Sequence, residues 1–269
     1  HFYQDPTTIY PRYLPLPGAE ERIYEKIKPL AIRFGDEQLD LPPLVKMTYR
    51  VDLPDDARRA YDELERDLVT TIGRNELTAR NVGVATQKLR QIANGGIYLG
   101  DGERRWQEVH LAKVELLLEL VEELEGQPAL VAYEFHHDLE RILSVLGKGT
   151  PHVGGGTTPR DLARIKAAWN AGDLPVLLGQ PQAVAWGLNL QRGGRAVIFH
   201  SLTWDYEMYY QFYKRVWRLG QKRKTLLYHI VVRDTVDEAM LASLASKRRT
   251  QARLFDALQI YLNKKKKLS

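Results

Sequence analysis

The sequence predicts an α/β fold in which helices cover both faces of a parallel sheet. After residue 126, short apolar runs such as 129–133 and 196–200 alternate with stretches of helical periodicity. Unbroken apolar runs are typical of strands buried on both faces, and strands separated by helices are typical of parallel sheets. A helical lead-in is predicted before this sheet, and a long helix is predicted after it.

The composition limits the kind of protein. The chain has 269 residues, of which 44% are apolar and 27% are charged, as in ordinary globular proteins. It contains no cysteine, so disulfides and thiolate metal sites are excluded. No apolar run approaches the ~18 residues of a membrane span, and we expect no membrane partner. The net charge of +5 permits a polyanionic partner without requiring one.

The elements before residue 126 are predicted to be irregular at first and then helical. Proline and aromatic residues dominate residues 1–50, around one predicted helix at 19–27. Apolar residues at helical spacing then predict helices at 55–71, 77–93 and 109–124. Gly126 directly follows the last of them and is a typical helix stop.

Strands and helices alternate in the remainder. Helices are expected at 137–146 and 159–171, the second with Thr158 as N-cap and Pro159 at its first position. A final helix is expected from residue 236 to about residue 262, before four lysines at 264–267. The predicted strands are 129–133, 150–153, 176–178, 196–200 and 226–232.

Residues 211–221 carry the most specific polar pattern. On a helix with about 100° per residue, Gln211, Arg215 and Arg218 share one narrow stripe among apolar neighbours. Two guanidiniums on a mostly buried helix are costly unless an anion or an acidic partner meets them. Ion pairs with Asp or Glu and recognition of a phosphate group both remain open at this point.

The predicted topology gives these residues a position. Ligands of open parallel sheets bind in the loops at the carboxyl ends of the strands. The loops after residues 178 and 200 lead to the run 187–191 and to the predicted arginine helix. We therefore expect both motifs at the carboxyl edge of the sheet.

The spacing of Gln211, Arg215, Arg218 and Gln221 resembles motif VI of the Swi/Snf-type DNA translocases of helicase superfamily two. The Gly-Leu-Asn-Leu run at 187–190 is similar to their motif V. Both motifs occur in the family's order.

Further stretches extend this resemblance over nearly the whole chain. Residues 130–135 correspond to motif IV, and Trp204 corresponds to a tryptophan between strand and helix. Residues 235–238 look like the Thr-Val-acidic segment after the last strand. The continuation Leu-Gln-Arg-Gly-Gly at 190–194 looks most like the phage-type members.

The resemblance implies a RecA-like fold, namely the second motor lobe of such a protein. Residues 1–50 would then be the end of the first motor lobe, and residues 51–126 the helical lead-in. Residues 127–235 would form the second lobe, and residues 236–269 a C-terminal helix with a basic tail.

The resemblance also implies an ATP site between two lobes and a double-stranded DNA track across them. The family's threonine that precedes motif V is replaced here by Gln180-Pro181. The implied site residues are Arg215, Arg218 and Gln211 for catalysis, Gly187, Asn189 and Gln221 for nucleotide binding, and Gly155, Thr157 and Gln180 for weak DNA contacts.

One half of an ATPase site is missing from the sequence. No glycine-rich loop ends in Gly-Lys-Ser or Gly-Lys-Thr, and no acidic pair follows a strand where Mg²⁺ would bind. We therefore expect ATP and Mg²⁺ to be held mainly by a first motor lobe, the chain's other partner beside DNA. The chain alone is predicted to be an inactive part of a cytoplasmic, bacterial or phage-encoded ATPase.

Two other functions were weighed. A non-catalytic DNA-binding or regulatory module would have the same fold without the chemistry. A free-standing nucleotide-binding enzyme would need its own phosphate loop, which is lacking. No metal site is predicted, because His136, His137 and His200 lack metal-ligand spacing and are interpreted as structural.

Overall fold

The computed structural model describes residues 2–4, 13–30, 39–73, 79–100, 105–185 and 188–246. The chain divides into two compact units, His1–Asp40 and Leu41–Ser269. The first unit contains an antiparallel pair, β1 (Phe2–Gln4) and β2 (Tyr13–Pro15), and helix α1 (Ala19–Ile27). The helix predicted at 19–27 is confirmed.

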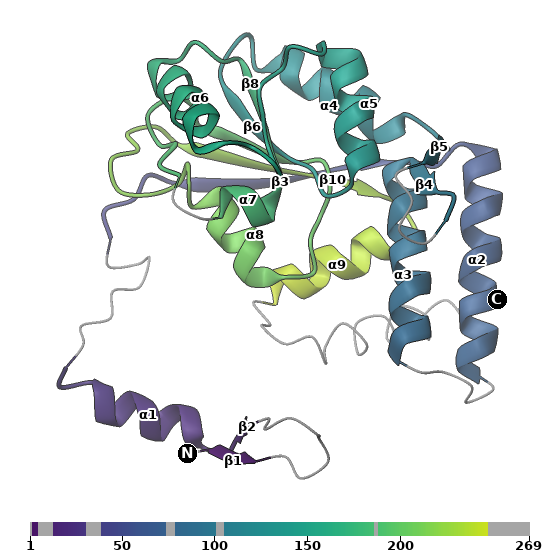
Figure 1. Ribbon diagram of the computed structural model, residues 1–269, viewed down its shortest axis with the longest axis horizontal. Coiled ribbons are helices and arrows are strands. Elements are labelled where there is room, and N and C mark those ends of the chain that lie inside the picture. The colour runs from purple at the N-terminus through teal and green to yellow at the C-terminus, as the bar shows by residue number, and fades with distance from the viewer. Residues whose placement is uncertain are drawn as a thin grey trace. The chain divides into compact units, whose positions relative to one another are not determined.

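The second unit is built on a parallel sheet (Figure 1). In spatial order its strands are β3 (Leu44–Val51), β10 (Thr225–Val232), β9 (Ala196–Phe199), β6 (Ala129–Ala132), β8 (Val176–Gly179) and β7 (His152–Val153). Each neighbouring pair is parallel. The predicted fold class and the five predicted strands are confirmed.

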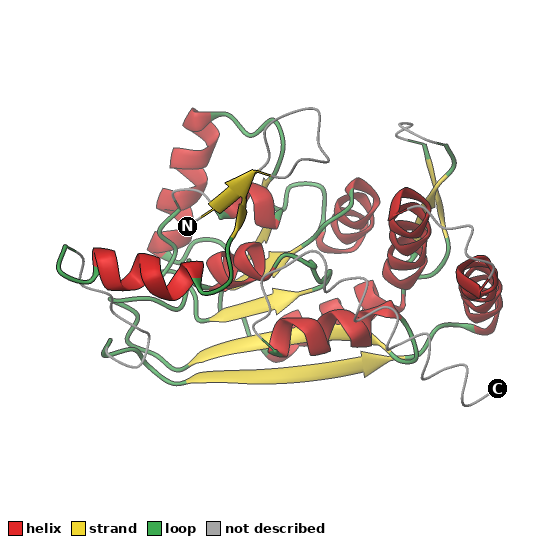
Figure 2. Ribbon diagram, turned by 90° about the horizontal axis from the view of Figure 1, so that it is seen from below, coloured by secondary structure: helices red, strands yellow, loops and turns green. Residues whose placement is uncertain are grey.

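Helices lie against both faces of this sheet, and Figure 2 shows them beside the strands. They are α4 (Ala112–Glu123) and α5 (His136–Leu146) on one face, and α6 (Pro159–Ala171), α7 (Pro181–Val184), α8 (Tyr206–Tyr213) and α9 (Val236–Ala245) on the other. Alternate side chains of β6 pack toward opposite faces: Val131 toward α4 and α5, Leu130 toward α6, α8 and α9. Strands buried on both faces explain the unbroken apolar runs.

The helical lead-in lies at one end of the sheet. It contains α2 (Asp55–Gly73), α3 (Ala79–Asn94) and a short hairpin of β4 (Gly96–Tyr98) and β5 (Trp106–Glu108). The amide of Val236 donates to the Tyr61 hydroxyl at 2.7 Å, and Arg58 donates to the carbonyl of Arg233 at 2.7 Å. These bonds fasten α2 to the turn between β10 and α9.

Strand β3 was not predicted. Its sequence places Lys46, Thr48 and Arg50 between apolar residues, so it lacks the unbroken apolar run of the inner strands. The structure explains this pattern, because β3 is an edge strand whose side chains are largely half-buried. The domain division predicted at residue 50 falls within this strand.

The predicted helix at 211–221 is wrong over most of its length. Helix α8 ends at Tyr213, and turns follow up to Gly220, which has a φ of 95°. The carbonyl of Arg215 accepts a hydrogen bond from the amide of Leu190 at 3.0 Å. A contact with a distant segment therefore replaces the continuation of the helix.

The predicted N-cap Thr158 is confirmed, and Thr235, for which no cap was predicted, is an N-cap as well. The Thr158 side chain accepts from the amide of Asp161 at 3.2 Å and begins α6. The Thr235 side chain accepts from the amide of Asp237 at 3.3 Å and begins α9. The predicted extension of the last helix to about residue 262 and the lysines at 264–267 lie outside the described residues.

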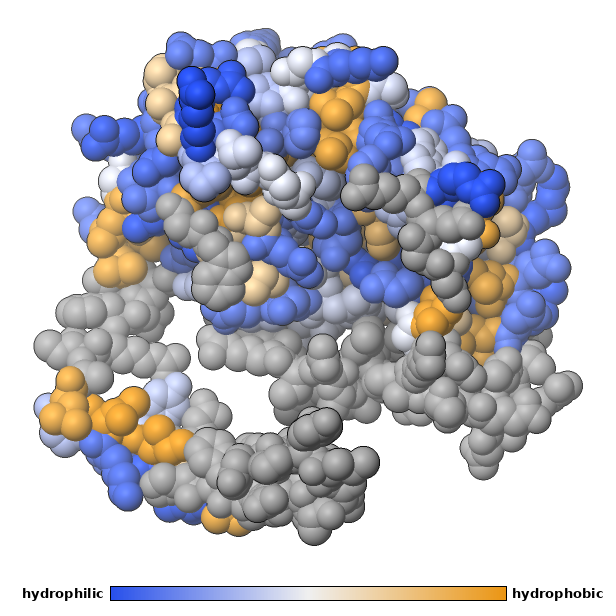
Figure 3. Space-filling model, in the orientation of Figure 1, coloured by the Kyte–Doolittle hydropathy of each residue, from blue (hydrophilic) through white to orange (hydrophobic). Residues whose placement is uncertain are grey.

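Polar groups dominate the face of the second unit that Figure 3 shows, and apolar side chains form separate groups between them. Such scattered apolar residues are normal for a protein surface. No helix in the described ranges has the length and apolar composition needed to cross a membrane.

Candidate functional site

The two arginines of the 211–221 segment lie together against the loop that follows α7. Arg215 donates to the carbonyl of Leu188 at 3.4 Å and to the carbonyl of Ala185. Arg218 donates to the side-chain oxygen of Asn189. We call Arg215 and Arg218 the arginine pair. The two sequence motifs that the resemblance had singled out are thus in direct contact.

The arginine pair has no acidic partner within the described ranges. No carboxylate there lies within ion-pair distance of Arg215 or Arg218. The Nε atom of Arg215 is buried and makes no hydrogen bond. Burial, and then the nearby charge of Arg218, lower the pKa of Arg215. The described carboxylates leave this positive charge unneutralised, which disfavours the structural ion-pair interpretation.

The two glutamines of the motif have separate positions. Gln211 donates to the carboxylate of Glu207 at 2.8 Å, within α8. Gln221 is buried and donates to the carbonyls of Gln191 at 3.0 Å and Gly194 at 2.9 Å. The predicted stripe of Gln211 and the two arginines on one helix is wrong, since α8 ends before Arg215.

The prediction that both motifs lie at the carboxyl edge does not hold for Gln221. Gln180, which belongs to neither motif, directly follows β8 and lies at that edge. Gln221, in contrast, contacts Gly194, which lies just before the first residue of β9. Helix α8 carries the chain back along the sheet, so the arginine pair lies between α7 and the amino ends of the strands. Gly187 lies outside the described residues.

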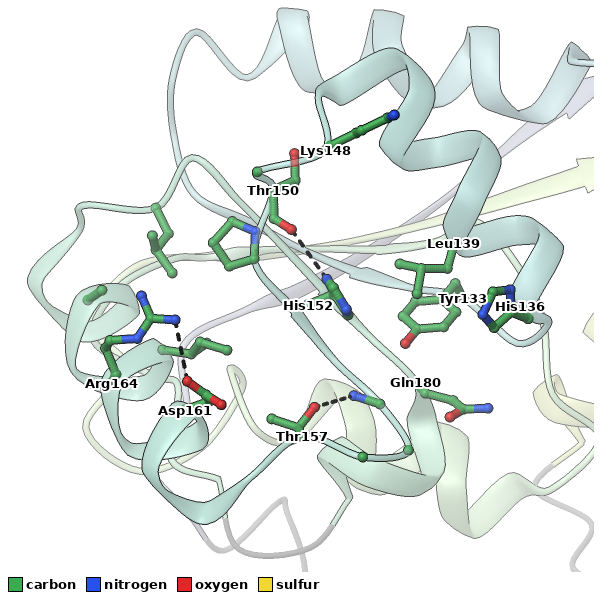
Figure 4. Close-up of a pocket in the computed structure, with 18 residues that line it drawn as sticks. Tyr133, His136, Leu139, Lys148, Thr150, His152, Thr157, Asp161, Arg164 and Gln180 are labelled. Atoms are coloured by element: carbon green, nitrogen blue, oxygen red, sulfur yellow. Dashed lines mark hydrogen bonds and ion pairs between the residues drawn. The ribbon is translucent and has the colours of Figure 1, made fainter.

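A cavity of about 780 Å³ lies around the carboxyl ends of β7 and β8 (Figure 4). The structure brings the three predicted DNA contacts, Gly155, Thr157 and Gln180, together in its wall. The Thr157 hydroxyl accepts from the amide of Gly154 at 3.0 Å, and Gln180 donates to a backbone carbonyl at 3.2 Å. Figure 4 shows Tyr133 between Leu139 and Gln180.

The cavity wall combines a protonated hydroxyl with several cations. Burial raises the pKa of Tyr133 to about 12, so its hydroxyl keeps its proton at neutral pH. A Cβ atom at Gly154 would lie 2.4 Å from that hydroxyl, which explains why glycine occupies the position. Lys148 and Arg164 also line the cavity, and Arg164 forms an ion pair with Asp161 at 3.6 Å.

A second group of charges is buried between the helices. Lys113 contacts Asp237 at 2.6 Å and Asn94 at 2.7 Å, and Arg141 contacts Asp138 at 3.0 Å. Asn94 also donates to Asp138 at 3.1 Å, which joins the two ion pairs. We call these five residues the buried ionic cluster. Sequence reasoning did not predict it, although a lysine on the apolar face of α4 was a signal.

Buried histidine and serine side chains extend this cluster. Ser201 donates to Asp138 at 2.7 Å, and Nδ1 of His200 lies 3.1 Å from the Ser201 hydroxyl. Burial lowers the pKa of His200 to about 3 and that of His110 to about 4. No three His, Cys, Asp or Glu side chains in the described ranges come together as metal ligands.

The comparisons with known proteins agree on one family. Residues 112–220 match the family model of the helicase conserved C-terminal domain. The chain is 37% identical over 225 residues to protein p41 of Acyrthosiphon pisum secondary endosymbiont phage 1, covering 82% of this chain and 47% of p41. It is 26% identical over 221 residues to the CHD3-type chromatin-remodeling factor CHR7 of Arabidopsis thaliana, covering 75% and 18%. The chain thus spans about half the length of its phage relative.

Solved structures share the fold. The C-terminal part of the Fun30 ATPase domain matches with a TM-score of 0.66 at 13% identity, covering 84% of this chain and 99% of that one. The SWI2/SNF2 ATPase core of Sulfolobus solfataricus in complex with double-stranded DNA matches with a TM-score of 0.59 at 20% identity, covering 86% and 50%. Residues 112–220 therefore carry a helicase conserved C-terminal domain, and the chain shares the fold of the C-terminal lobe of Swi/Snf-type ATPases.

Proposed function

We propose that this chain is the second motor lobe of an ATP-dependent translocase on double-stranded DNA. Arg215 and Arg218 would reach the γ-phosphate of an ATP molecule held by a first motor lobe. The observation that carries this proposal is the positive charge of the arginine pair, which the described carboxylates do not neutralise. Charged groups retained without a counter-charge are suited to an anionic ligand.

The chemistry follows from the geometry of the arginine pair. As the bond to the γ-phosphate breaks, negative charge develops on the oxygens, and fixed guanidiniums stabilise it. Such arginines can be worth ~10³–10⁵ in rate. The carbonyls of Ala185 and Leu188 and the side chain of Asn189 hold the two guanidiniums in place.

The remaining site residues have supporting roles in this proposal. Through its hydrogen bonds, Gln221 holds the turns that carry the arginine pair against the segment before β9. Gln211 would contact the phosphate or help to hold the arginines when the lobes close. Gly187 and Asn189 would allow close approach of the nucleotide to the loop after α7.

The surroundings of the arginine pair suit an anionic ligand such as ATP. The Nε atom of Arg215 makes no hydrogen bond to a described residue, and burial together with the nearby charge of Arg218 lowers the pKa of Arg215. Bound phosphate would relieve both effects. Mg²⁺ and most of the nucleotide would be held by the first lobe, in keeping with the missing phosphate loop.

DNA would be bound through its phosphates at the cavity of Figure 4. Gly155, Thr157 and Gln180 would supply the contacts there, with Lys148 nearby. The capped N-terminus of α6 adds a partial positive charge at the same place. The double-stranded DNA named for the Sulfolobus neighbour supports this proposal.

The first compact unit, His1–Asp40, would belong to the end of the first motor lobe. Apolar side chains gather over α1 in Figure 3, where Tyr24 is 39%, Ile27 41% and Leu30 87% exposed. A packing partner such as a first lobe would cover them. The greater length of p41 and its phage origin support a first lobe and a cytoplasmic, bacterial or phage-encoded protein.

DNA-stimulated ATP turnover tests the proposal, in a polypeptide that carries this chain and a first motor lobe. The Arg218→Ala variant should lose at least about 100-fold in turnover while its thermal unfolding stays unchanged. Arg223→Ala is the matched control: within the described ranges the Arg223 side chain donates to the carbonyl of Gly193 alone, at 3.4 Å, and this change should cost less than about 3-fold.

Two further results complete this test. The chain on its own should hydrolyse no ATP. If the longer polypeptide shows no turnover, or if turnover is indifferent to Arg218, the arginine pair is structural. The non-catalytic DNA-binding module would then be the correct function.

A further inference from the structure

We infer that helix α6 couples the cavity at the carboxyl edge to the arginine pair, and that Asn170 at its C-terminal end is a positioning residue for Arg218. The inference rests on the proposed function, and it assigns a route by which DNA contact would reach the ATP site. The two ends of α6 contact different sites.

The N-terminal end of α6 lies at the cavity. Thr157 and Asp161 line the cavity, and Thr158 between them caps the helix (Figure 4). The Thr158 hydroxyl also donates to the Asp161 carboxylate at 2.7 Å. A DNA phosphate bound at Thr157 would therefore lie directly beside the first turn of α6.

The C-terminal end of α6 holds the loop that follows α7. The indole of Trp169 donates to the carbonyl of Leu190 at 2.7 Å. The Asn170 amide donates to the carbonyl of Asn189 at 2.9 Å, and its oxygen accepts from the amide of Arg192 at 3.3 Å. Two consecutive side chains of α6 thus fix three positions of this loop.

The same loop holds both arginines from its other side. The Asn189 side chain accepts a hydrogen bond from Arg218, and the Leu190 amide donates to the carbonyl of Arg215 at 3.0 Å. Asn170 is therefore separated from the Arg218 guanidinium by a single residue. Trp169 is likewise separated from the backbone of Arg215 by Leu190.

The C-terminal end of α6 and this loop are packed too closely to move independently of each other. Trp169 is completely buried. A Cβ atom at Gly193 would lie 1.8 Å from the Trp169 carbonyl, and one at Gly194 would lie 2.7 Å from its ring. Only glycines allow this close packing. The loop must follow the end of the helix when the helix moves.

A 13-residue helix is stiff over its length of about 20 Å. A displacement at Thr157 would therefore reach Asn170 as a movement of one body. Asn170 would shift the Asn189 carbonyl, and Asn189 would turn the guanidinium of Arg218 toward or away from the phosphate. Errors of about 1 Å in such a group can cost about 100-fold in rate.

Asn170→Ala in the two-lobe polypeptide tests the inference. Asn170 is only half-buried, so the change should leave thermal unfolding unchanged. We expect the DNA-stimulated kcat to fall by about 10-fold, with the KM for ATP and DNA binding changed by less than about 3-fold. Lys166→Ala, on the same helix, is the matched control and should leave kcat unchanged.

Two further variants separate positioning from structure. In an Arg218→Ala background, Asn170→Ala should cause no additional loss, because both changes remove the same effect. Asn170→Asp keeps the oxygen that accepts from Arg192 but loses the amide that donates to Asn189. It should therefore behave like Asn170→Ala.

The outcomes distinguish the inference from the function on which it rests. If Arg218→Ala abolishes turnover while Asn170→Ala leaves kcat intact, the coupling is overturned and the proposed function stands. Equal losses for Asn170→Ala in both backgrounds, or a matching loss for Lys166→Ala, also overturn it. If Arg218→Ala itself has no effect, the proposed function is wrong, and the inference that rests on it is wrong as well.

Discussion

Two groups of cations in this protein have opposite surroundings. In the buried ionic cluster, Lys113 and Arg141 are almost completely buried, and each lies within 3.0 Å of a carboxylate. The arginine pair is half-buried, and within the described ranges it contacts only carbonyl oxygens and the amide of Asn189.

The difference lies in the counter-charge rather than in the residue type. Removing a cation from water is costly, and a nearby carboxylate offsets that cost inside the protein. The cluster contains one carboxylate for each cation, so its charges sum to zero and it joins α3, α4, α5 and α9. The arginine pair keeps its charge, which makes it the candidate for binding a phosphate.

The largest effect on stability is expected from Arg141→Ala. This change leaves the buried carboxylate of Asp138 without its cation and should lower the free energy of unfolding by about 3–5 kcal/mol. Arg218→Ala is the matched change in the other group and should cost less than about 1 kcal/mol, since no described carboxylate depends on Arg218.

Denaturant unfolding of this chain measures both values. Arg141→Lys is a second variant for the case in which Arg141→Ala does not fold, since it keeps the charge and should recover part of the loss. Equal losses for Arg141→Ala and Arg218→Ala would contradict the distinction between the two groups.

A smaller effect is expected within the cluster itself. Lys113→Met leaves Asp237 unpaired, and Asp237→Asn leaves Lys113 unpaired, so each single change should be destabilising. Asparagine can still accept the hydrogen bond from the Val232 amide, which is 3.1 Å from Asp237. The double variant should therefore be more stable than the sum of the single losses by about 1–3 kcal/mol. Strict additivity in denaturant unfolding would show that the two charges do not interact.

The last effect is a dependence on pH, to which His110 and His200 beside the cluster contribute together with the buried His229, whose pKa is lowered to about 4. Burial lowers the pKa of His110 to about 4 and of His200 to about 3, below the usual value of 6.5. The unfolded chain therefore binds protons first as the pH falls, and stability is lost from about pH 6.5 down toward those values. We expect a loss on the order of 1–2 kcal/mol for each histidine between pH 7 and pH 5.

Thermal unfolding at a series of pH values checks this prediction. His200→Gln removes one of the three buried titrating histidines and should make the profile less steep, whereas Arg218→Ala should leave its shape unchanged. A profile that is flat between pH 7 and pH 5 in the unaltered chain would rule out neutral buried histidines.

Local patterns were sufficient for much of the fold. Helix α6 was predicted with its bounds, because the Thr158 cap and Pro159 at the first position act within a single turn. The inner strands were predicted within two residues, because a strand buried on both faces needs an apolar run whatever its neighbours are. The spacing of Arg215 and Arg218 likewise identified the two arginines that now lie together.

Other features depend on contacts between segments that are far apart in the chain. Helix α8 ends at Tyr213 because Leu190, 25 residues from Arg215, bonds to the arginine's carbonyl. Gln221 belongs to the segment before β9 for the same kind of reason. Helical periodicity gives no information about such partners.

The sequence by itself thus determined the α/β class and most of the elements, and it singled out Arg215 and Arg218 as candidates. Only the tertiary structure decided that the arginine pair has no described acidic partner and that Lys113 has one. It alone also decided that Asn170 contacts the loop that holds Arg218. The physical reason is that helix propensity and capping act over a few residues. Whether a charge is neutralised depends instead on which distant groups the fold brings within about 4 Å of it.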